Sequence, residues 1–176
     1  FDWARDCDAI HEGSMKVVGR LKSHPGVAIV SALSGTGDDL IPREISTLCQ
    51  LRADGIRTVR FSPHMLDVPC YDTSTVVQSK GYLIQYFSED AAFMYEEGEV
   101  GTADYCKEPV RKLRILSCDE GDWVMNKDTI RVLKENKLEA AFMEDLTAYV
   151  RWLLLKRMRI NDFQGVLGKD GHFYVV

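Results

Sequence analysis

Two polar residues near the end of the chain, Asp162 and Gln164, stand two positions apart just before a predicted hairpin. On an extended segment this spacing points both side chains to one face, while Phe163 between them faces the other way. A carboxylate can take a proton from a reacting hydroxyl, and an amide oxygen can ligate a hard cation such as magnesium. Asp162 after Asn161 also suits a turn before a strand, and a glutamine is an ordinary polar strand residue. The spacing alone leaves both roles open.

Cysteines and histidines form no comparable pattern. The five cysteines are widely spaced and contain no Cys-x-x-Cys pair, so the sequence predicts buried free thiols in a reducing compartment rather than a zinc site or a disulfide framework. The four histidines have no ligand spacing to a cysteine, and no Cys–His nucleophile pair is legible. Gly35-Thr36-Gly37 could bind phosphate, but an isolated Gly-x-Gly is a weak signal and a flexible connector is the simpler interpretation.

The composition is that of an ordinary soluble globular protein. The 176 residues are 45% apolar and 28% charged, which suits one domain or two small lobes sharing a cleft. A net charge of −5 argues against a broad nucleic-acid-binding face, and no apolar run reaches membrane-spanning length. The densest basic run, at 151–159, alternates with leucine and methionine and fits a solvated helix flank.

The first half of the chain is predicted to be rich in strands with one helix. Alternating apolar residues predict strands at 15–21, 27–33, 56–61, 76–77 and 82–87. Turns are expected at 23–26 and 79–81, and loops at 34–39 and 62–75. Pro42 favours a helix start and Asp54-Gly55 a helix end. The apolar face of that helix would contain Ile45, Leu48, Cys49 and Leu51.

The second half is predicted to be mainly helical. A short helix is expected around 93–95, a second at 128–135, and a longer amphipathic helix at 138–156. Segment 109–118 fits neither pattern clearly. Residues 166–167 and 173–176 then flank the turn Gly168-Lys169-Asp170-Gly171 as a hairpin. The predicted fold class is therefore α+β.

This order of elements resembles that of the two-lobed protein kinases, with an N-lobe at 1–87 and a reduced, mainly helical C-lobe at 88–176. The tail at 164–176 is similar to the kinase segment that runs from the catalytic loop to the Asp-Phe-Gly motif. Gln164 stands in place of the metal-binding asparagine, and the position after Val176 corresponds to the magnesium-binding aspartate. The segment 42–48 resembles the kinase αC helix, in which Glu44 would pair with the nucleotide lysine.

Two further segments carry the resemblance. The segment 81–87 is similar to the strand that enters the kinase hinge, which implies that the backbones of Gln85 and Phe87 hydrogen-bond adenine and that Ile84 is the gatekeeper. Gly13 and Ser14 lie in a segment, 12–18, that resembles the glycine-rich loop, although it has one glycine where kinases usually have three.

The sequence departs from the kinase pattern at two positions. Val30 stands where the strand lysine is expected, but Gly13-Ser14-Met15-Lys16 resembles the Gly-Ser-Phe-Lys arrangement of kinases called "with no lysine". The resemblance therefore implies Lys16 as the phosphate-binding cation, with Lys22 in reserve. Arg159 falls at the spacing of the catalytic aspartate, and it cannot act as a base because it stays protonated. The nearest carboxylate is Asp162, so the resemblance implies that Asp162 takes the catalytic role.

The shortened Asp-x-Gln motif before a hairpin resembles a minimal family of bacterial type III effector kinases that inactivate the host chaperone of the HSP-ninety class. The resemblance implies an ATP- and magnesium-dependent Ser/Thr protein kinase, secreted into the host cell cytoplasm and acting as a monomer on a protein substrate. The implied sites are catalytic Asp162, Lys16 and Glu44, a nucleotide site of Gly13, Ser14, Lys16, Gln85 and Phe87, and a metal ligand, Gln164.

Alternatives remain open from the sequence. Lys16 also suits a plain surface lysine, and Glu44 a solvated helix residue. The missing strand lysine and the displaced aspartate favour a kinase-fold binding module that has lost catalysis, whereas the retained tail pattern argues against that module. A kinase-fold enzyme that phosphorylates a small molecule would usually carry a larger helical lobe, which this length barely permits.

Overall fold

The chain forms two compact units, Phe1–Gln50 with Arg60–Phe87, and Leu51–Val59 with Ser88–Val176. The sequence predicted one boundary, at residue 87. The segment Leu51–Val59 lies before that boundary but belongs to the second unit. The computed structural model describes residues 1–73, 77–86, 92–94, 112–116, 133–135, 137–158, 162–168 and 172–175. For 92–94, 112–116, 162–164 and 166–168 the backbone alone is described. The predicted α+β class is confirmed.

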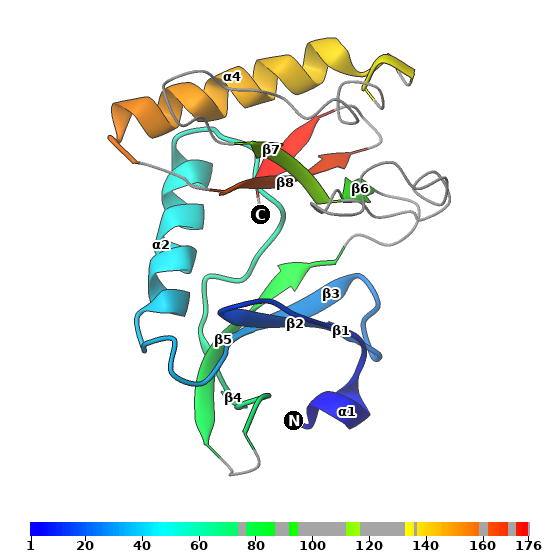
Figure 1. Cartoon of the computed structure of the whole chain (residues 1–176), viewed down its shortest axis with the longest axis vertical. Helices are drawn as coiled ribbons and strands as arrows, with labels where there is room; N and C mark the ends of the chain where they lie inside the picture. Colours follow the sequence, from blue (N-terminus) through cyan, green and yellow to red (C-terminus); the bar gives the residue numbers. More distant parts are fainter. Residues whose placement is uncertain are drawn as a thin grey trace. The chain divides into compact units, whose positions relative to one another are not determined.

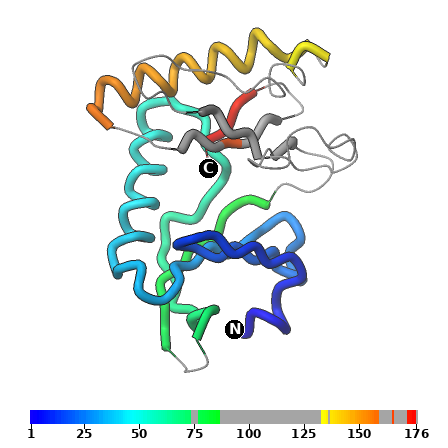
Figure 2. Tube along the Cα trace, viewed as in Figure 1, coloured from blue at the N-terminus to red at the C-terminus, as the bar shows by residue number. Residues whose placement is uncertain are grey.

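The first unit is built on a five-stranded antiparallel sheet. Across the sheet the strands are β1 (Cys7–Glu12), β2 (Lys16–Leu21), β3 (Val27–Ala32), β5 (Gln78–Gln85) and β4 (Leu66–Pro69). The turn predicted between β2 and β3 is closed by a 2.8 Å hydrogen bond from the Val27 N–H to the His24 carbonyl. Figure 2 follows this unit from the blue N-terminus into the cyan helix α2 (Leu40–Ala53) and back to green β4 and β5.

One face of this sheet packs on a core that the short helix α1 (Trp3–Asp6) completes. The buried cluster contains Trp3, Cys7, Val17, Ile29, Leu33 and Val68. The Trp3 indole N–H donates to the Pro69 carbonyl at 2.7 Å, and the Tyr71 ring meets Trp3 edge-on. Because a buried indole N–H needs an acceptor, this bond fixes α1 to the end of β4. The sequence analysis did not predict β1 or α1.

The opposite face of the sheet lies under α2. Side chains alternate along a strand, so residues next to the buried Val17 and Ile29 face the other way. The row Val18, Val30 and Tyr82 is paired directly across β2, β3 and β5. Glu44 of α2 contacts both Lys16 and Tyr82, and buried Ile41, Ile45 and Leu48 form the apolar side of the helix. Figure 1 shows α2 running beside the sheet.

The helix start, its apolar face and its end were largely predicted correctly. The Ile56 N–H bonds to the Leu51 carbonyl at 2.9 Å just beyond α2, which ends the helix at the predicted Asp54-Gly55. One residue of the predicted apolar face is wrong, because Cys49 is exposed. Cys7 and Cys70 are buried free thiols, as expected. Cys106 and Cys118 lie outside the described residues.

One strand, one loop and one turn predicted in this half are wrong. Segment 56–61 makes only two isolated bridges, Thr58 to Val175 and Phe61 to Ile84. The predicted loop at 62–75 contains β4, and the predicted hairpin turn at 79–81 lies inside the continuous strand β5. Turn-type residues are tolerated there because Gly81 allows a close approach of β3: a Cβ at this position would lie 2.7 Å from the Val30 carbonyl oxygen.

The second unit contains a four-stranded antiparallel sheet. β8 (Asp162–Gly168) pairs with β6 (Ala92–Met94), β7 (Lys112–Leu116) and β9 (Phe173–Val175). The helix predicted around 93–95 is wrong, because Ala92–Met94 is a strand. The segment 109–118, which fitted neither pattern in the sequence, contains β7. The hairpin at the end of the chain is confirmed. Of the helix predicted at 128–135, residues 133–135 are helical and the others lie outside the described residues.

The one long helix described in this unit, α4 (Glu139–Leu155), confirms the helix predicted at 138–156. The described residues are therefore a sheet with a helix, not the mainly helical arrangement that was predicted. Phe142 of α4 meets Phe173 of β9 edge-on, with ring centroids 5.6 Å apart. The Asp145 carboxylate accepts the Phe173 N–H at 2.9 Å. The apolar contact and the hydrogen bond together hold β9 against α4.

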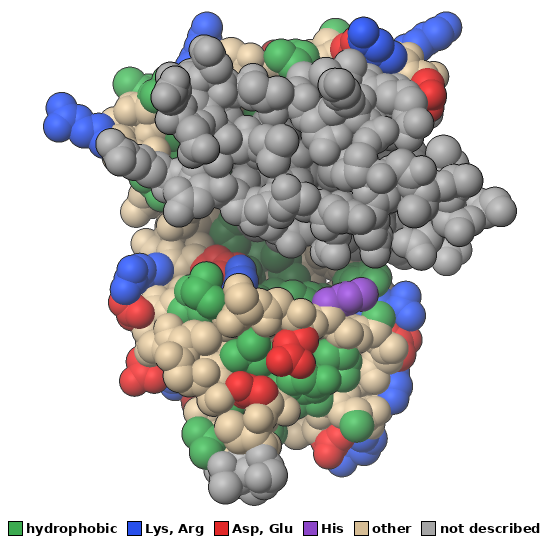
Figure 3. Space-filling view, in the orientation of Figure 1, with side chains coloured by type: hydrophobic (Ala, Val, Ile, Leu, Met, Phe, Trp, Pro, Cys, Tyr) green, Lys and Arg blue, Asp and Glu red, His purple; other side chains and the backbone are tan. Residues whose placement is uncertain are grey.

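Charged side chains are distributed as pairs on the described surface. Arg20 pairs with Asp8 and Lys80 with Asp67 in the first unit, and Figure 3 shows basic and acidic side chains interspersed on its visible face. In the described part of the chain, no helix combines the length and the apolar composition needed to cross a bilayer.

Gly165 provides a test of the packing in the second unit. A Cβ at this position would lie 2.2 Å from the Phe173 ring and 2.7 Å from the Tyr174 carbonyl oxygen. Gly165→Ala should therefore lower the free energy of unfolding by about 1–3 kcal/mol or more. Gly26→Ala is the matched control, because nothing lies within 4 Å of its Cβ position. Urea denaturation of both variants measures the difference, and equal midpoints would show that Phe173 is not packed over Gly165.

Candidate active site

The strongest cluster of interacting polar groups on the described α2 side of the first sheet consists of Lys16, Glu44 and Tyr82. The Lys16 ammonium lies 2.8 Å from Glu44 Oε2, and the Tyr82 hydroxyl donates to Glu44 Oε1 at 2.6 Å. Each carboxylate oxygen therefore has its own donor, one from β2 and one from β5. The Lys16 and Glu44 side chains are 36% and 18% exposed, whereas Tyr82 is fully buried. The cluster runs from the interior to the surface.

Lys16 is positioned by the hairpin between β1 and β2. It is the first residue of β2 and follows the three-residue loop Gly13-Ser14-Met15. The Gly13 N–H donates to the Lys16 carbonyl at 2.8 Å, and the Leu33 N–H donates to the Met15 carbonyl at 2.9 Å. These bonds bring the predicted nucleotide residues Gly13 and Ser14 next to Lys16 and fasten the loop to the end of β3.

Val30 stands where the kinase resemblance places a strand lysine, and its surroundings are apolar. Val30 is buried and lies between Val18 and Tyr82 in one cross-strand row. The face under α2 is therefore closely packed at Val30, and the lysine that contacts Glu44 belongs to the neighbouring strand β2. Lys22, the reserve candidate, is not brought to Glu44: its ammonium donates to the Ala4 and Arg5 carbonyls at 2.9 and 2.8 Å. Lys22 caps the end of α1.

Two effects of different size hold Glu44 in place. A partly exposed ion pair such as Lys16–Glu44 contributes about 0–1 kcal/mol, because water screens it and two long side chains must be ordered. A hydrogen bond to a charged group contributes about 1.5–3 kcal/mol. Burial, together with the nearby Glu44 charge and its hydrogen bond, raises the pKa of Tyr82 above its ordinary value of 10. The hydroxyl therefore stays protonated at neutral pH and remains a donor.

Gln85, one of the predicted hinge residues, makes two hydrogen bonds with Arg60. Its backbone N–H donates to the Arg60 carbonyl at 2.6 Å, and its side-chain oxygen accepts the Arg60 N–H at 3.2 Å. A backbone contact to adenine at this position would therefore have to use the carbonyl oxygen. Ile84, the predicted gatekeeper, is buried and pairs with Ala28. Phe87, the other predicted hinge residue, lies outside the described residues.

Asp162 and Gln164 lie two positions apart on β8, paired with Leu116 and Arg114 of β7. The extended backbone that their spacing requires is present. The structure describes the backbone of these two residues but not their side chains, so their catalytic and metal-binding roles stay predictions. Arg159 lies outside the described residues. Among the described residues, no group of three or more His, Cys, Asp or Glu side chains could hold a metal ion.

The Gly35-Thr36-Gly37 loop is fixed by an acidic residue. The Asp72 carboxylate accepts the Ser34 N–H at 3.0 Å and the Ser34 hydroxyl at 2.6 Å. It also accepts from the Cys70 thiol at 3.0 Å. These bonds, the Ser34 hydroxyl first, hold the pKa of Asp72 at about 2. A carboxylate at the start of the loop repels phosphate, so the connector interpretation is favoured.

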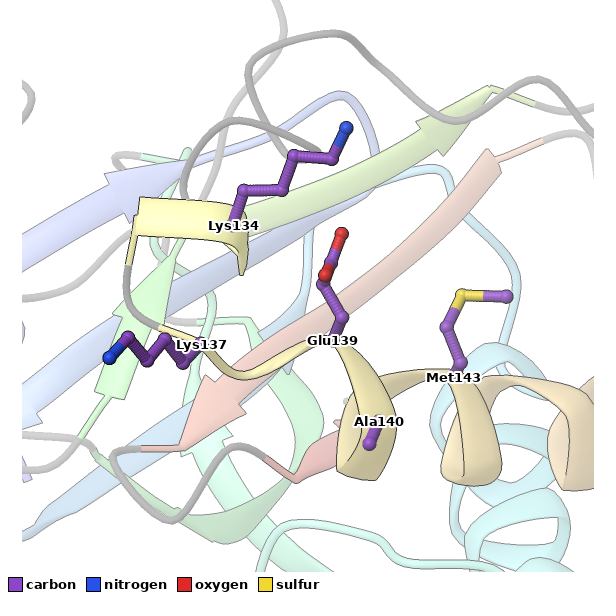
Figure 4. A pocket seen from close by; sticks show the side chains of 5 residues that line it. All are labelled: Lys134, Lys137, Glu139, Ala140 and Met143. Carbon is purple, nitrogen blue, oxygen red and sulfur yellow. The ribbon is translucent and has the colours of Figure 1, made fainter.

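A shallow hollow of about 460 Å³ lies at the start of α4. Lys134, Lys137, Glu139, Ala140 and Met143 line it. Figure 4 shows the side chains of Lys134 and Lys137 pointing apart, so their charges do not converge on one point. The hollow therefore lacks the convergent polar groups typical of a ligand site.

Sequence reasoning missed three polar residues that organise these regions. From the sequence, Tyr82 was predicted to be an apolar strand residue and Asp72 to be part of a loop. Asp145 read as a polar helix residue, yet it bonds the Arg57 Nε at 3.0 Å, the His172 Nδ1 at 2.7 Å and the Phe173 N–H. No local spacing signals such roles, because every partner other than Cys70, which lies beside Asp72, is 27 or more positions away in the sequence.

Comparison with known proteins does not identify a family: no protein-family model matches the chain, and no curated protein matches it.

The depressed pKa of Asp72 predicts a pH dependence. A carboxyl group whose folded-state pKa, about 2, lies below its ordinary value of 3.8 adds stability that is present above about pH 4 and is lost as pH falls toward 2. Asp72→Asn should therefore lower the melting temperature at pH 6 and reduce its fall between pH 4 and 2. Asp38→Asn, in the neighbouring loop and outside this network, is the control. An unchanged acid profile in Asp72→Asn would contradict the assignment.

Proposed function

We propose that this chain is an ATP- and magnesium-dependent Ser/Thr protein kinase with a reduced, two-lobed kinase-like fold. The observation that carries the proposal is the Lys16–Glu44 contact, 2.8 Å from ammonium to carboxylate. It joins the strand after a glycine-containing hairpin loop to the helix that follows the third strand of an antiparallel sheet. The kinase resemblance implies the same contact.

The chemistry of phosphoryl transfer suits these residues. Transfer depends on positioning and charge neutralisation more than on covalent participation by the protein. One N–H of the Lys16 ammonium is used on Glu44 Oε2, which leaves its other donors for phosphate oxygens. ATP, when bound, supplies the phosphoryl group. Gly13 and Ser14 would cover its phosphates from the hairpin loop, and Glu44 would keep the cation from moving away.

The remaining roles belong to the tail. Asp162 would orient the acceptor hydroxyl and take its proton, and Gln164 would offer an amide oxygen to magnesium. The proposal includes the setting that the resemblance implied: a bacterial effector secreted into the host cytoplasm, with a host protein, such as the HSP-ninety-class chaperone, as substrate. A kinase-fold binding module without catalysis is the main alternative, and transfer assays separate the two.

Lys16 gives the first test of this proposal. Lys16→Ala should lower phosphoryl transfer from labelled ATP to protein by roughly 10²–10³-fold, the loss typical of removing one group that stabilises transition-state charge. Lys80→Ala is the matched control, because Lys80 is another partly exposed lysine of the same sheet paired with a carboxylate, Asp67. Equal transfer by the two variants would contradict the role of Lys16. Transfer by neither variant nor the wild type would favour the binding module.

Asp162 and Gln164 give a second test that separates proton transfer from metal binding. Asp162→Asn keeps the shape of the side chain and removes the base, so transfer should fall by roughly 10²–10⁴-fold while ATP affinity changes little. Gln164→Ala should instead raise the magnesium concentration needed for half-maximal transfer. Transfer rates measured over a magnesium titration report both effects. Wild-type rates in Asp162→Asn would make Asp162 a structural residue of β8.

A further inference from the structure

The carboxylate of Glu44 bridges two strands that are not neighbours. Lys16 belongs to β2 and Tyr82 to β5, and β3 lies between them in the sheet. The β3 residues paired with this region are Val30, opposite Tyr82, and the small Ala32, opposite Lys16. The carboxylate spans β3 with Oε1 on the Tyr82 hydroxyl and Oε2 on the Lys16 ammonium. Its orientation is therefore set from both sides.

The two ends of this bridge differ in how firmly they are held. Tyr82 is fully buried in β5, whereas the Lys16 side chain is more than a third exposed and has several rotatable bonds. A flexible surface lysine cannot fix the rotamer of a glutamate, because ordering two long side chains offsets most of the gain from their attraction. A buried phenol hydroxyl with two rotatable angles loses little entropy when it binds. The fixed end of the bridge is Tyr82.

We infer that Tyr82 is a positioning residue: its hydroxyl occupies Glu44 Oε1, so that Glu44 presents only Oε2 to Lys16 and the ammonium keeps donors for a phosphate. Without the hydroxyl, Glu44 is free to turn and bind Lys16 through both oxygens, which draws the ammonium toward α2. The link to ATP rests on the proposed function, whereas the effect of Tyr82 on Lys16 does not.

The test compares Tyr82→Phe with Tyr71→Phe in the intact chain. Tyr71 loses the same hydroxyl on the opposite face of the sheet, where it packs against Trp3. Tyr82→Phe should weaken ATP binding by about tenfold or more, the factor expected from losing one hydrogen bond to a charged group, and Tyr71→Phe should not. A purely structural hydroxyl would lower the melting temperature but leave the ATP dissociation constant unchanged at temperatures where the variant is folded.

A second readout does not depend on ATP. The rate at which an acylating reagent labels Lys16, followed by mass spectrometry of the Lys16 peptide, should differ from wild type in Tyr82→Phe and not in Tyr71→Phe. If wild-type protein binds no ATP, the proposed function fails and this labelling rate alone decides the inference. Equal labelling and, where ATP binds, equal affinity in Tyr82→Phe and wild type would overturn it.

Should Tyr82→Phe fail to fold, the wild-type protein still supplies a test. A buried hydroxyl proton bonded to a carboxylate exchanges slowly with water, so NMR should detect it as a separate downfield resonance. Glu44→Gln should shift that resonance, because the acceptor loses its charge. Absence of the resonance, or its persistence at the same position in Glu44→Gln, would overturn the assignment of Tyr82 as the residue that fixes Glu44.

Discussion

Glu44 is a mostly buried carboxylate whose two oxygens each require a donor, and the arrangement of the first unit satisfies both. Leaving a buried charge without a partner costs several kcal/mol, so α2 is held over the face of the sheet that offers Lys16 and Tyr82. Val30 and Ala32 pack beneath this bridge, and the Gly13-Ser14-Met15 loop is tied to Lys16 by the Gly13 hydrogen bond. One carboxylate therefore joins α2 to β2, which follows the loop, and to β5.

The second unit uses a carboxylate in a similar way. Asp145 joins Arg57, His172 and the Phe173 N–H, and thereby holds α4, the segment after α2 and the terminal hairpin together. Phe142 and Tyr149 of α4 pack on Phe173. The hairpin that carries Asp162 and Gln164 is thus anchored at β9 by apolar rings and by one acid.

Periodic segments were predictable because their local sequence pattern and their tertiary packing favour the same structure. This holds for β2, β3, α2, α4 and the last hairpin. β5 was not predictable, because Ser79-Lys80-Gly81 is turn-like locally and becomes a strand only when β3 and β4 pair with it. β6 replaced a predicted helix for the same reason, since pairing with β8 decides it. The kinase resemblance implied the Lys16–Glu44 contact, but no residue near Tyr82 in the sequence indicates a hydrogen bond from its hydroxyl to Glu44. Its partner is set by the sheet.

We propose that Lys16, held by Glu44, receives the phosphates of a nucleotide. Calorimetric titration of the protein with ATP, with and without magnesium, tests this most directly when combined with thermal melts at saturating nucleotide. If Lys16 has this role, ATP should bind with a measurable heat that magnesium strengthens, and should stabilise the protein by about 2–3 kcal/mol when ATP exceeds its dissociation constant roughly a hundredfold. No heat of binding and an unchanged melting temperature at millimolar ATP would contradict it.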